Sequence, residues 1–208
     1  MTAVVVLDDQ PLMTLDEFQD WHPDGVGPRY ELIEGEIVVM EPTGPHSMIG
    51  GKLSRSFWIA IGGQPYFIPR ECVVQSIDTN KTGYRPDVIV LDERTLNDDP
   101  LWLKRSRITR GDSVILVVEI VSTNWRDDYL KKLADYEALG IPEYWIVDYL
   151  GLAATRYIGK GKPPTLTIYQ LVNGEYQAQQ FRGDDRIQSS ALPELNLTAN
   201  QVFLTSVA

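Results

Sequence analysis

The chain has 208 residues, of which 43% are hydrophobic and 23% are charged, a balance that predicts a folded protein with a sizeable core. A formal net charge of -10 argues against a protein that coats DNA without specificity, but it is compatible with an acidic site that binds cations. The only cysteine, Cys72, excludes an internal disulfide and suits a reducing compartment. No apolar run reaches the ~18 residues of a membrane span, and the start lacks the basic region of a signal peptide, so we expect a cytoplasmic protein.

The first third of the chain predicts a helix, a hairpin and a second helix. Residues 1–13 are expected to form a flexible lead-in, and a capping-box pattern then begins a short helix at 14–21. Two strand-like runs within 30–40 flank Glu34-Gly35 and predict a hairpin. The apolar stripe of residues 46–61 predicts the second helix, which Gly62-Gly63 ends.

Four polar residues in this region are candidates whose ordinary interpretation is structural. Glu31, Glu34 and Glu36 alternate along the hairpin, a pattern that favours solvent-facing side chains. His46 would lie at the start of the second helix, where a histidine is usually a polar end group.

The middle of the chain predicts a sheet interrupted by one long connection. Residues 64–77 have strand signals, and 84–91 form an apolar, β-branched run with one carboxylate, Asp87, near its entry. A polar insertion of about twenty residues follows at 92–111, which is long for a connection and predicts a short helix or a flap.

The stretch 113–148 predicts a strand, a helix and a second strand. The apolar run of its first strand is interrupted by one carboxylate, Glu119, and the predicted helix spans 127–139. Beyond it, 154–181 is rich in strand signals, and Asn173-Gly174 predicts a hairpin turn. The end of the chain predicts a packing segment with a short helix, and with no repeat or boundary in view we expect one domain over 1–208.

Asp87 and Glu119 share a context, because each is the only charge within a run of apolar strand residues. On neighbouring strands the two carboxylates would meet, which is unfavourable unless a cation lies between them. Oxygen ligands are what Mg²⁺ prefers, and the backbone carbonyl of Ile120 would supply another. The alternative is that the two carboxylates cap loops or pair separately with Arg or Lys.

The predicted helix at 127–139 places one of its two lysines beside the sheet. Its buried stripe consists of Tyr129, Leu133 and Tyr136, and Lys132 lies about 60° from the centre of that stripe whereas Lys131 lies nearly opposite it. Asp128, four residues before Lys132, can orient the ammonium group. The alternative for Lys132 is a surface ion pair of little energetic value. Dinucleotide, phosphate-loop, zinc-cluster and nucleophile-elbow motifs are absent from the sequence.

Five motifs, taken in chain order, resemble those of one family. They are YELIEGEIVVMEPTG followed by His46, RPDVIV, VVEIVSTN, Asp128 with Lys132 and Tyr136, and GIPEYWIVD. Together they resemble the PD-(D/E)XK nuclease superfamily, and more closely its bacterial Uma-type branch of restriction-endonuclease-like proteins. The resemblance extends over roughly 14–203.

The resemblance implies an α/β fold, mixed α+β, with a restriction-endonuclease-like core of helix, three strands, helix and strand. Here these are 46–61, 64–77, 85–91, 113–122, 127–139 and 143–148, with an extra N-terminal hairpin and a C-terminal β-meander. It implies Asp87 and Glu119 as Mg²⁺ ligands, with Mn²⁺ as an alternative.

Two departures from the superfamily pattern concern the remaining site residues. Val121 occupies the usual lysine position, so the resemblance suggests that Lys132 supplies the amine. The first core helix has no acidic residue, so Glu34 or Glu41 would serve in its place, together with His46.

The implied function is a Mg²⁺-dependent endonuclease that hydrolyses phosphodiester bonds of DNA, with a homodimer as one way of cutting both strands. Two alternatives stay open. One is a nucleic-acid-binding or regulatory module on a nuclease fold that no longer cuts, which Val121 motivates. The other is a structural protein whose acidic residues only face solvent, which the net charge of -10 motivates.

Overall fold

The described strands form two six-stranded sheets. The computed structural model describes residues 4–6, 11–21 and 29–203. One sheet is built from shorter strands and is called the smaller sheet. Its order is β1 (Val4–Val6), β3 (Glu36–Met40), β2 (Arg29–Ile33), β6 (Gly83–Tyr84), β5 (Val73–Gln75) and β8 (Arg107–Ile108). The larger sheet has the order β12 (Glu175–Phe181), β11 (Thr165–Val172), β10 (Glu143–Asp148), β9 (Val114–Ile120), β7 (Val88–Asp92) and β4 (Tyr66–Phe67).

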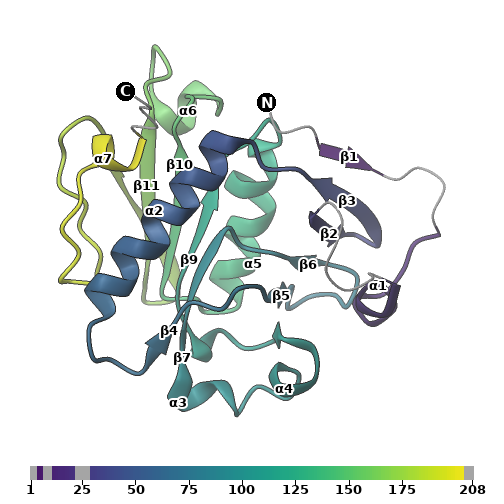
Figure 1. Ribbon diagram of the computed structural model, residues 1–208. Helices are drawn as coiled ribbons and strands as arrows, with labels where there is room; N and C mark the ends of the chain where they lie inside the picture. The colour runs from purple at the N-terminus through teal and green to yellow at the C-terminus, as the bar shows by residue number, and fades with distance from the viewer. Residues whose placement is uncertain (1–3, 7–10, 22–28, 204–208) are drawn as a thin grey trace.

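The longest helix, α2 (Gly44–Ile61), and α5 (Leu133–Ala138) lie on opposite faces of the larger sheet (Figure 1). Strand β9 shows why both faces are covered: Val117 and Val121 pack with the helix α5 side, while Val118 and Ile120 pack with α2. Because side chains alternate along a strand, Glu119 points to the α5 side. The remaining helices are short: α1 (Leu15–Trp21), α3 (Glu93–Leu96), α4 (Trp102–Arg105), α6 (Thr155–Ile158) and α7 (Ala199–Phe203).

The register of the central strands brings Asp87 to Glu119. Strand β7 runs antiparallel to β9 with Val88 opposite Val118, so the residue before Val88 lies beside the residue after Val118. Strand β10 runs parallel to β9, with Ile146 opposite Glu119. A parallel pair needs a crossover, and the helix between β9 and β10 provides it.

The helix that follows β9 begins with a π-helical turn, Asp127–Lys132, and continues as α5. Such turns are rare and often occur at functional sites. Together the two segments span 127–138, which confirms the predicted helix at 127–139, although its first part is wound more widely than an α-helix. None of the helices within residues 11–21 and 29–203 combines the length and apolar character that a membrane crossing requires.

The mixed α/β class and the predicted element order are confirmed, with three local corrections. The lead-in contains strand β1, which pairs with β3; residues 1–3 and 7–10 lie outside the described part. Residues 64–77 form two short strands in different sheets, β4 and β5, because Pro69 and the polar Arg70 and Glu71 interrupt them. The insertion at 92–111, expected to carry a short helix or a flap, holds two short helices, α3 and α4, and in addition strand β8.

Several turn and cap predictions are confirmed. The backbone N–H of Thr14 donates to the Glu17 carboxylate at 2.7 Å, and the N–H of Glu17 donates to the Thr14 hydroxyl at 3.3 Å, which is a reciprocal capping box. The Glu34-Gly35 turn has φ values of 55° and 88°, the left-handed conformation of a tight hairpin. Asn173-Gly174 turns in the same way between β11 and β12.

Candidate active site

Glu119 is a buried carboxylate at the end of β9, with 3% of its surface exposed. One carboxylate oxygen accepts a hydrogen bond from the Tyr136 hydroxyl at 2.8 Å, and the other lies 3.0 Å from the Lys132 ammonium nitrogen. Both partners come from the helix that crosses this end of the sheet. The apolar strand therefore tolerates a carboxylate because that helix supplies a cation and a donor.

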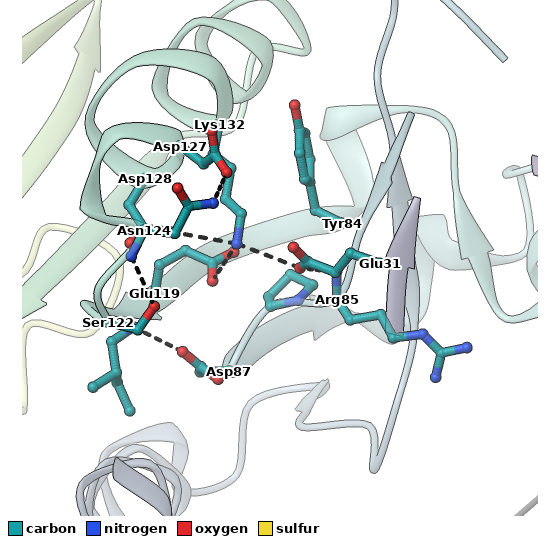
Figure 2. A network of polar contacts seen from close by, with 12 residues as sticks. Glu31, Tyr84, Arg85, Asp87, Glu119, Ser122, Asn124, Asp127, Asp128 and Lys132 are labelled. Carbon is teal, nitrogen blue, oxygen red and sulfur yellow. Dashed lines mark hydrogen bonds and ion pairs between the residues drawn. The ribbon is translucent and has the colours of Figure 1, made fainter. Parts of the chain in front are cut away.

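Lys132 has 2% of its surface exposed and lies among three carboxylates. Its ammonium nitrogen is 3.0 Å from Glu119, 3.3 Å from Glu31 and 3.4 Å from Asp128. Figure 2 shows the ammonium group between Glu119 and Glu31. The prediction that Lys132 rather than Lys131 points toward the sheet is confirmed, because Lys131 is exposed.

The charges of this cluster do not balance. Burial alone would lower the pKa of Lys132, but Glu119, Glu31 and Asp128 outweigh burial and raise it well above its usual value. Burial and the neighbouring carboxylates raise the pKa of Asp128 to about 7, despite the opposing effect of Lys132. Burial likewise raises the pKa of Glu119. The raised pKa keeps Lys132 protonated at neutral pH, and the surplus negative charge favours the uptake of a proton or of another cation.

Asp87 lies just before β7 and has its own set of partners. One carboxylate oxygen accepts from Arg29 at 3.1 Å, and the other accepts from the backbone N–H of Ile120 at 2.8 Å. The Nε2 atom of His46 is 3.3 Å from that second oxygen. Burial would raise the pKa of Asp87, but His46, Arg29 and the N–H of Ile120 lower it to about 2.

His46, in the first turn of α2, connects Asp87 with the neighbouring strand. Its Nε2 atom lies 3.0 Å from the backbone carbonyl oxygen of Ile120, and the residue is buried. Burial would lower the pKa of this imidazole, but its contact with Asp87 raises it. His46 is therefore buried against Asp87 and is not the exposed end group that its position favoured.

A small cavity of about 10 Å³ joins the two carboxylates, which is room for about one water molecule or ion. Its walls are Arg29, Met40, Pro42, His46, Arg85, Asp87, Glu119 and Ser122. Each carboxylate oxygen has two lone pairs, so Asp87 and Glu119 can bind a cation without losing their present hydrogen bonds.

The donor chemistry of this cavity fits a divalent cation such as Mg²⁺, which takes oxygen ligands and retains several waters. Within the described residues, no three His, Cys, Asp and Glu side chains already form a metal cluster. A bound ion would therefore draw on the two carboxylates, on the Ile120 carbonyl and on water.

The fourth carboxylate of the site is Glu31, and the expectation that it faces solvent is wrong. Glu31 is 1% exposed, accepts from the backbone N–H of Arg85 at 2.7 Å and contacts Lys132. The sequence gave only a weak signal, because the apolar pair Leu32-Ile33 follows Glu31, but Glu34 and Glu36 in the same hairpin favoured a solvent-facing pattern.

The two acidic residues proposed in its place lie at the surface. Glu34 is exposed and pairs with Lys131 at 2.9 Å, and Glu41 is exposed. Glu36 faces solvent as expected. Arg29, which the sequence did not single out, contacts Asp87 and donates to the carbonyl oxygens of Arg85 and Pro86 at 2.7 and 2.6 Å.

Comparisons with known proteins agree with this architecture. The sequence model of the Uma2 family, described as "Putative restriction endonuclease", matches residues 15–200. A crystal structure from Anabaena variabilis ATCC 29413, described as "a putative nuclease belonging to DUF820", superposes with a TM-score of 0.66 at 20% sequence identity. The superposition covers 92% of this chain and 97% of the Anabaena chain. No curated protein matches the sequence significantly.

Proposed function

Because the chain belongs to the Uma2 family, we propose that it is a metal-dependent endonuclease that hydrolyses phosphodiester bonds of DNA. One observation supports this proposal most: Asp87 and Glu119 line one small cavity, and Glu119 contacts a buried, protonated lysine. The Ile120 carbonyl oxygen lies 3.0 Å from His46, which is part of the wall of the same cavity. A cluster of this composition costs stability in a protein that never binds a cation. Restriction-endonuclease-like families generally use a divalent metal.

Asp87, Glu119 and the Ile120 carbonyl would hold the cation, for which we propose Mg²⁺, with Mn²⁺ as the alternative. Such a cation lowers the pKa of a water and stabilises the negative charge that develops on the phosphate. Arg29 holds the Asp87 carboxylate from one side, and Tyr136 holds Glu119 from the other, so both ligands are fixed in advance.

Lys132 acts as a cation and not as a base, because its pKa is raised well above the usual value by Glu119, Glu31 and Asp128 against the effect of burial. Its ammonium group can neutralise the phosphate or orient the attacking water. Glu31 and Asp128 contact the same ammonium group and position it beside Glu119.

The test is metal-dependent cleavage by the variants Asp87→Ala, Glu119→Ala and Lys132→Ala, with Lys131→Ala as the matched control. We expect the first three to lose cleavage of duplex plasmid and of single-stranded DNA in Mg²⁺, by about 10²–10³-fold for the loss of a charge-stabilising group. Circular dichroism must show that each variant is folded. Unchanged cleavage by a folded variant would remove that residue from the proposal.

A second function is favoured because basic side chains of the protein itself pair with both candidate metal ligands. Asp87 contacts Arg29 and His46, and Glu119 contacts Lys132, so the fold offers each ligand a positive partner without a metal. A nucleic-acid-binding or regulatory module that no longer cuts would have this property. DNA binding in EDTA, together with no cleavage of any DNA in Mg²⁺ or Mn²⁺, would establish this alternative.

We also propose that the protein pairs with a second copy of itself. Among the described strands, β12 forms one end of the larger sheet and most of its residues are exposed, which suits edge-to-edge pairing. Light scattering after gel filtration measures the mass directly. A mass of one chain at micromolar concentration would contradict the dimer.

A further inference from the structure

Two arginine side chains on the surface each lie over an aromatic ring, and the two rings contact each other. The guanidinium carbon of Arg126 is 4.7 Å from the centre of the Trp125 ring, and that of Arg156 is 4.7 Å from the centre of the Tyr157 ring. The rings of Trp125 and Tyr157 pack edge to face, with their centres 5.9 Å apart. We call these four residues the arginine–aromatic patch.

The patch is held in place by the core beneath it. The buried Tyr129 packs against Tyr157, with ring centres 4.7 Å apart, and against Trp125, with ring centres 6.3 Å apart. Both arginines of the patch remain exposed. Because each guanidinium already lies against a ring, it loses less freedom when it binds an anion, and its planar set of N–H donors suits the oxygens of a phosphate.

The arginines of the patch have no carboxylate partner. In the described part of the chain, none of the ion pairs includes Arg126 or Arg156. Asp127, the acidic neighbour of Arg126 in the sequence, accepts instead from the amide of Asn124. Residues 149–174 contain three basic residues and no Asp or Glu, although the net charge of the chain is -10. An anion is therefore the partner that this surface favours.

The patch lies at the same end of the larger sheet as the candidate active site. Trp125 and Arg126 follow β9, and α6, which contains the other half of the patch, follows β10. Strands β9 and β10 are parallel, so both segments leave the sheet at the end where Glu119 lies. Ser122, which is part of the cavity wall, precedes Trp125 by three positions. Ligands of α/β proteins commonly bind beyond these carboxyl ends of the strands.

Another stacked arginine provides a contrast at the opposite end of the sheet. Arg94 lies over the Tyr66 ring at 5.8 Å, but its guanidinium also pairs with Asp92 at 2.6 Å. Arg94 belongs to α3, which follows β7, and β7 runs antiparallel to β9. Figure 1 shows α6 near the top of the larger sheet and α3 near the bottom. The stacked arginines without a carboxylate partner thus lie at the end that holds the candidate site.

We propose that the arginine–aromatic patch binds the DNA backbone on one side of the candidate site, with Arg126 and Arg156 each contacting a phosphate. Contacts of this kind position DNA and do not read its bases, so the binding is independent of sequence. The short distance in sequence from the cavity wall at Ser122 favours DNA over an anionic membrane as the source of the phosphates. The inference rests on the proposed function in its choice of DNA, but it holds whether or not the bound DNA is cut.

The experiment measures binding of the full chain to a fluorescent DNA duplex in EDTA, where metal-dependent cleavage does not interfere. Fluorescence anisotropy gives the dissociation constant at several salt concentrations. Each phosphate contact contributes about 0.9 to the slope of log affinity against log salt concentration. The double variant Arg126→Ala/Arg156→Ala should therefore lower this slope by about 2 and weaken binding by about tenfold at low salt. The loss should be the same for duplexes of unrelated sequence.

Two further variants show whether the charge at this place matters. Arg94→Ala is the matched control, because it removes an exposed arginine that also lies over a ring, and it should leave affinity and slope unchanged. Arg126→Lys/Arg156→Lys keeps both charges and should keep the salt slope, which a role of the two arginines in packing alone does not predict. Circular dichroism must show that each variant is folded.

The possible results separate the inference from the proposed function. Unchanged affinity and slope in the folded double alanine variant, or an equal loss in Arg94→Ala, would overturn the inference and leave the proposed metal chemistry intact. Binding to phosphatidylserine vesicles that the double alanine variant loses, with unchanged DNA binding, would assign the patch to a membrane instead. No DNA binding by the unaltered protein would overturn both the inference and the choice of DNA as substrate. The expected binding without cleavage in Mg²⁺ or Mn²⁺ would support the inference and contradict the endonuclease.

Discussion

Two buried glutamates on neighbouring strands of the larger sheet are held in opposite ways. Glu143, at the start of β10, is 1% exposed and accepts from the indole N–H of Trp145 at 2.6 Å. It also accepts from the hydroxyl of Ser189 at 2.6 Å and from the backbone N–H groups of Ser190 and Ala191 at 2.8 and 3.1 Å. Neutral donors therefore satisfy Glu143 completely. Glu119 has one neutral donor and shares its cation with two other carboxylates.

These different partners distinguish Glu143, whose carboxylate stabilises the fold, from Glu119, whose carboxylate is a candidate ligand for a cation. The donors of Glu143 anchor the segment near Ser189 to the sheet, and none of the ion pairs found within residues 11–21 and 29–203 includes Glu143. Around Glu119 the described ion pairs bring three carboxylates to one ammonium group. A surplus of buried negative charge opposes folding unless a proton or a cation balances it, and the proposed cation site would give a functional reason to keep such a cluster.

The largest effect is expected for Lys132→Met, which leaves three buried carboxylates without their cation. We expect the free energy of unfolding to fall by about 3–5 kcal/mol, the usual cost of removing one partner of a buried ion pair. Urea denaturation at pH 7 measures this loss. The carboxyl groups that remain will have higher pKa values in the folded protein than in the unfolded chain. Each therefore binds its proton more tightly when folded, which favours the folded state at low pH and is lost as the pH rises. The loss should therefore shrink as the pH is lowered toward 4.

Glu143→Ala is expected to affect stability alone. It leaves the donors of Trp145, Ser189 and Ser190 without their acceptor, which should cost about 2–3 kcal/mol. Ser189→Ala, which removes one of these donors, should cost about 1 kcal/mol. Urea denaturation gives both values, and calorimetry gives the affinity for Mn²⁺. A loss of Mn²⁺ affinity in folded Glu143→Ala would break the distinction between the two glutamates.

The sequence predicted the convergence of those candidate-site residues whose placement depends on local patterns. Asp87 and Glu119 were found because each interrupts an apolar run, and strand pairing then brings them together. Lys132 was found from the helical repeat, although the helix begins with a π-helical turn. The prediction holds because Asp128 and Lys132 still lie about one turn apart and contact each other at 3.4 Å.

The part that was missed depends on contacts that strand β2 of the smaller sheet makes with the helix after β9 and with the loop before β7. Glu31 reaches Lys132 over 101 residues of sequence, and Arg29 reaches Asp87 over 58. The burial of side chains along strand β2 does not alternate, because the consecutive residues Glu31, Leu32 and Ile33 are all buried. The two-residue period that places side chains on a solvent-facing strand gives no information about such a strand.

An intermediate effect is expected for Asp87→Asn, and it should depend on pH. His46 and Arg29 lower the pKa of Asp87 from 3.8 to about 2 against the effect of burial. A lowered pKa stabilises the fold above the unfolded value and loses this effect as the pH falls through the folded value. Two units correspond to about 2–3 kcal/mol. Urea midpoints of both proteins from pH 6 to pH 2 should therefore differ most above pH 4 and converge near pH 2, and a constant difference would contradict this origin.

The smallest effect is expected for Lys131→Ala, the neighbour of Lys132 on the same helix. Its partner Glu34 is 2.9 Å away, but the side chains of both residues are exposed. Exposed ion pairs contribute at most about 1 kcal/mol and often nothing measurable. We expect a change in the free energy of unfolding of less than about 0.5 kcal/mol and unchanged affinity for Mn²⁺. If Lys131→Ala instead weakened cleavage as strongly as Lys132→Ala, surface charge would matter more than the buried network. In that case the burial of Lys132 among three carboxylates would not explain its role in cleavage.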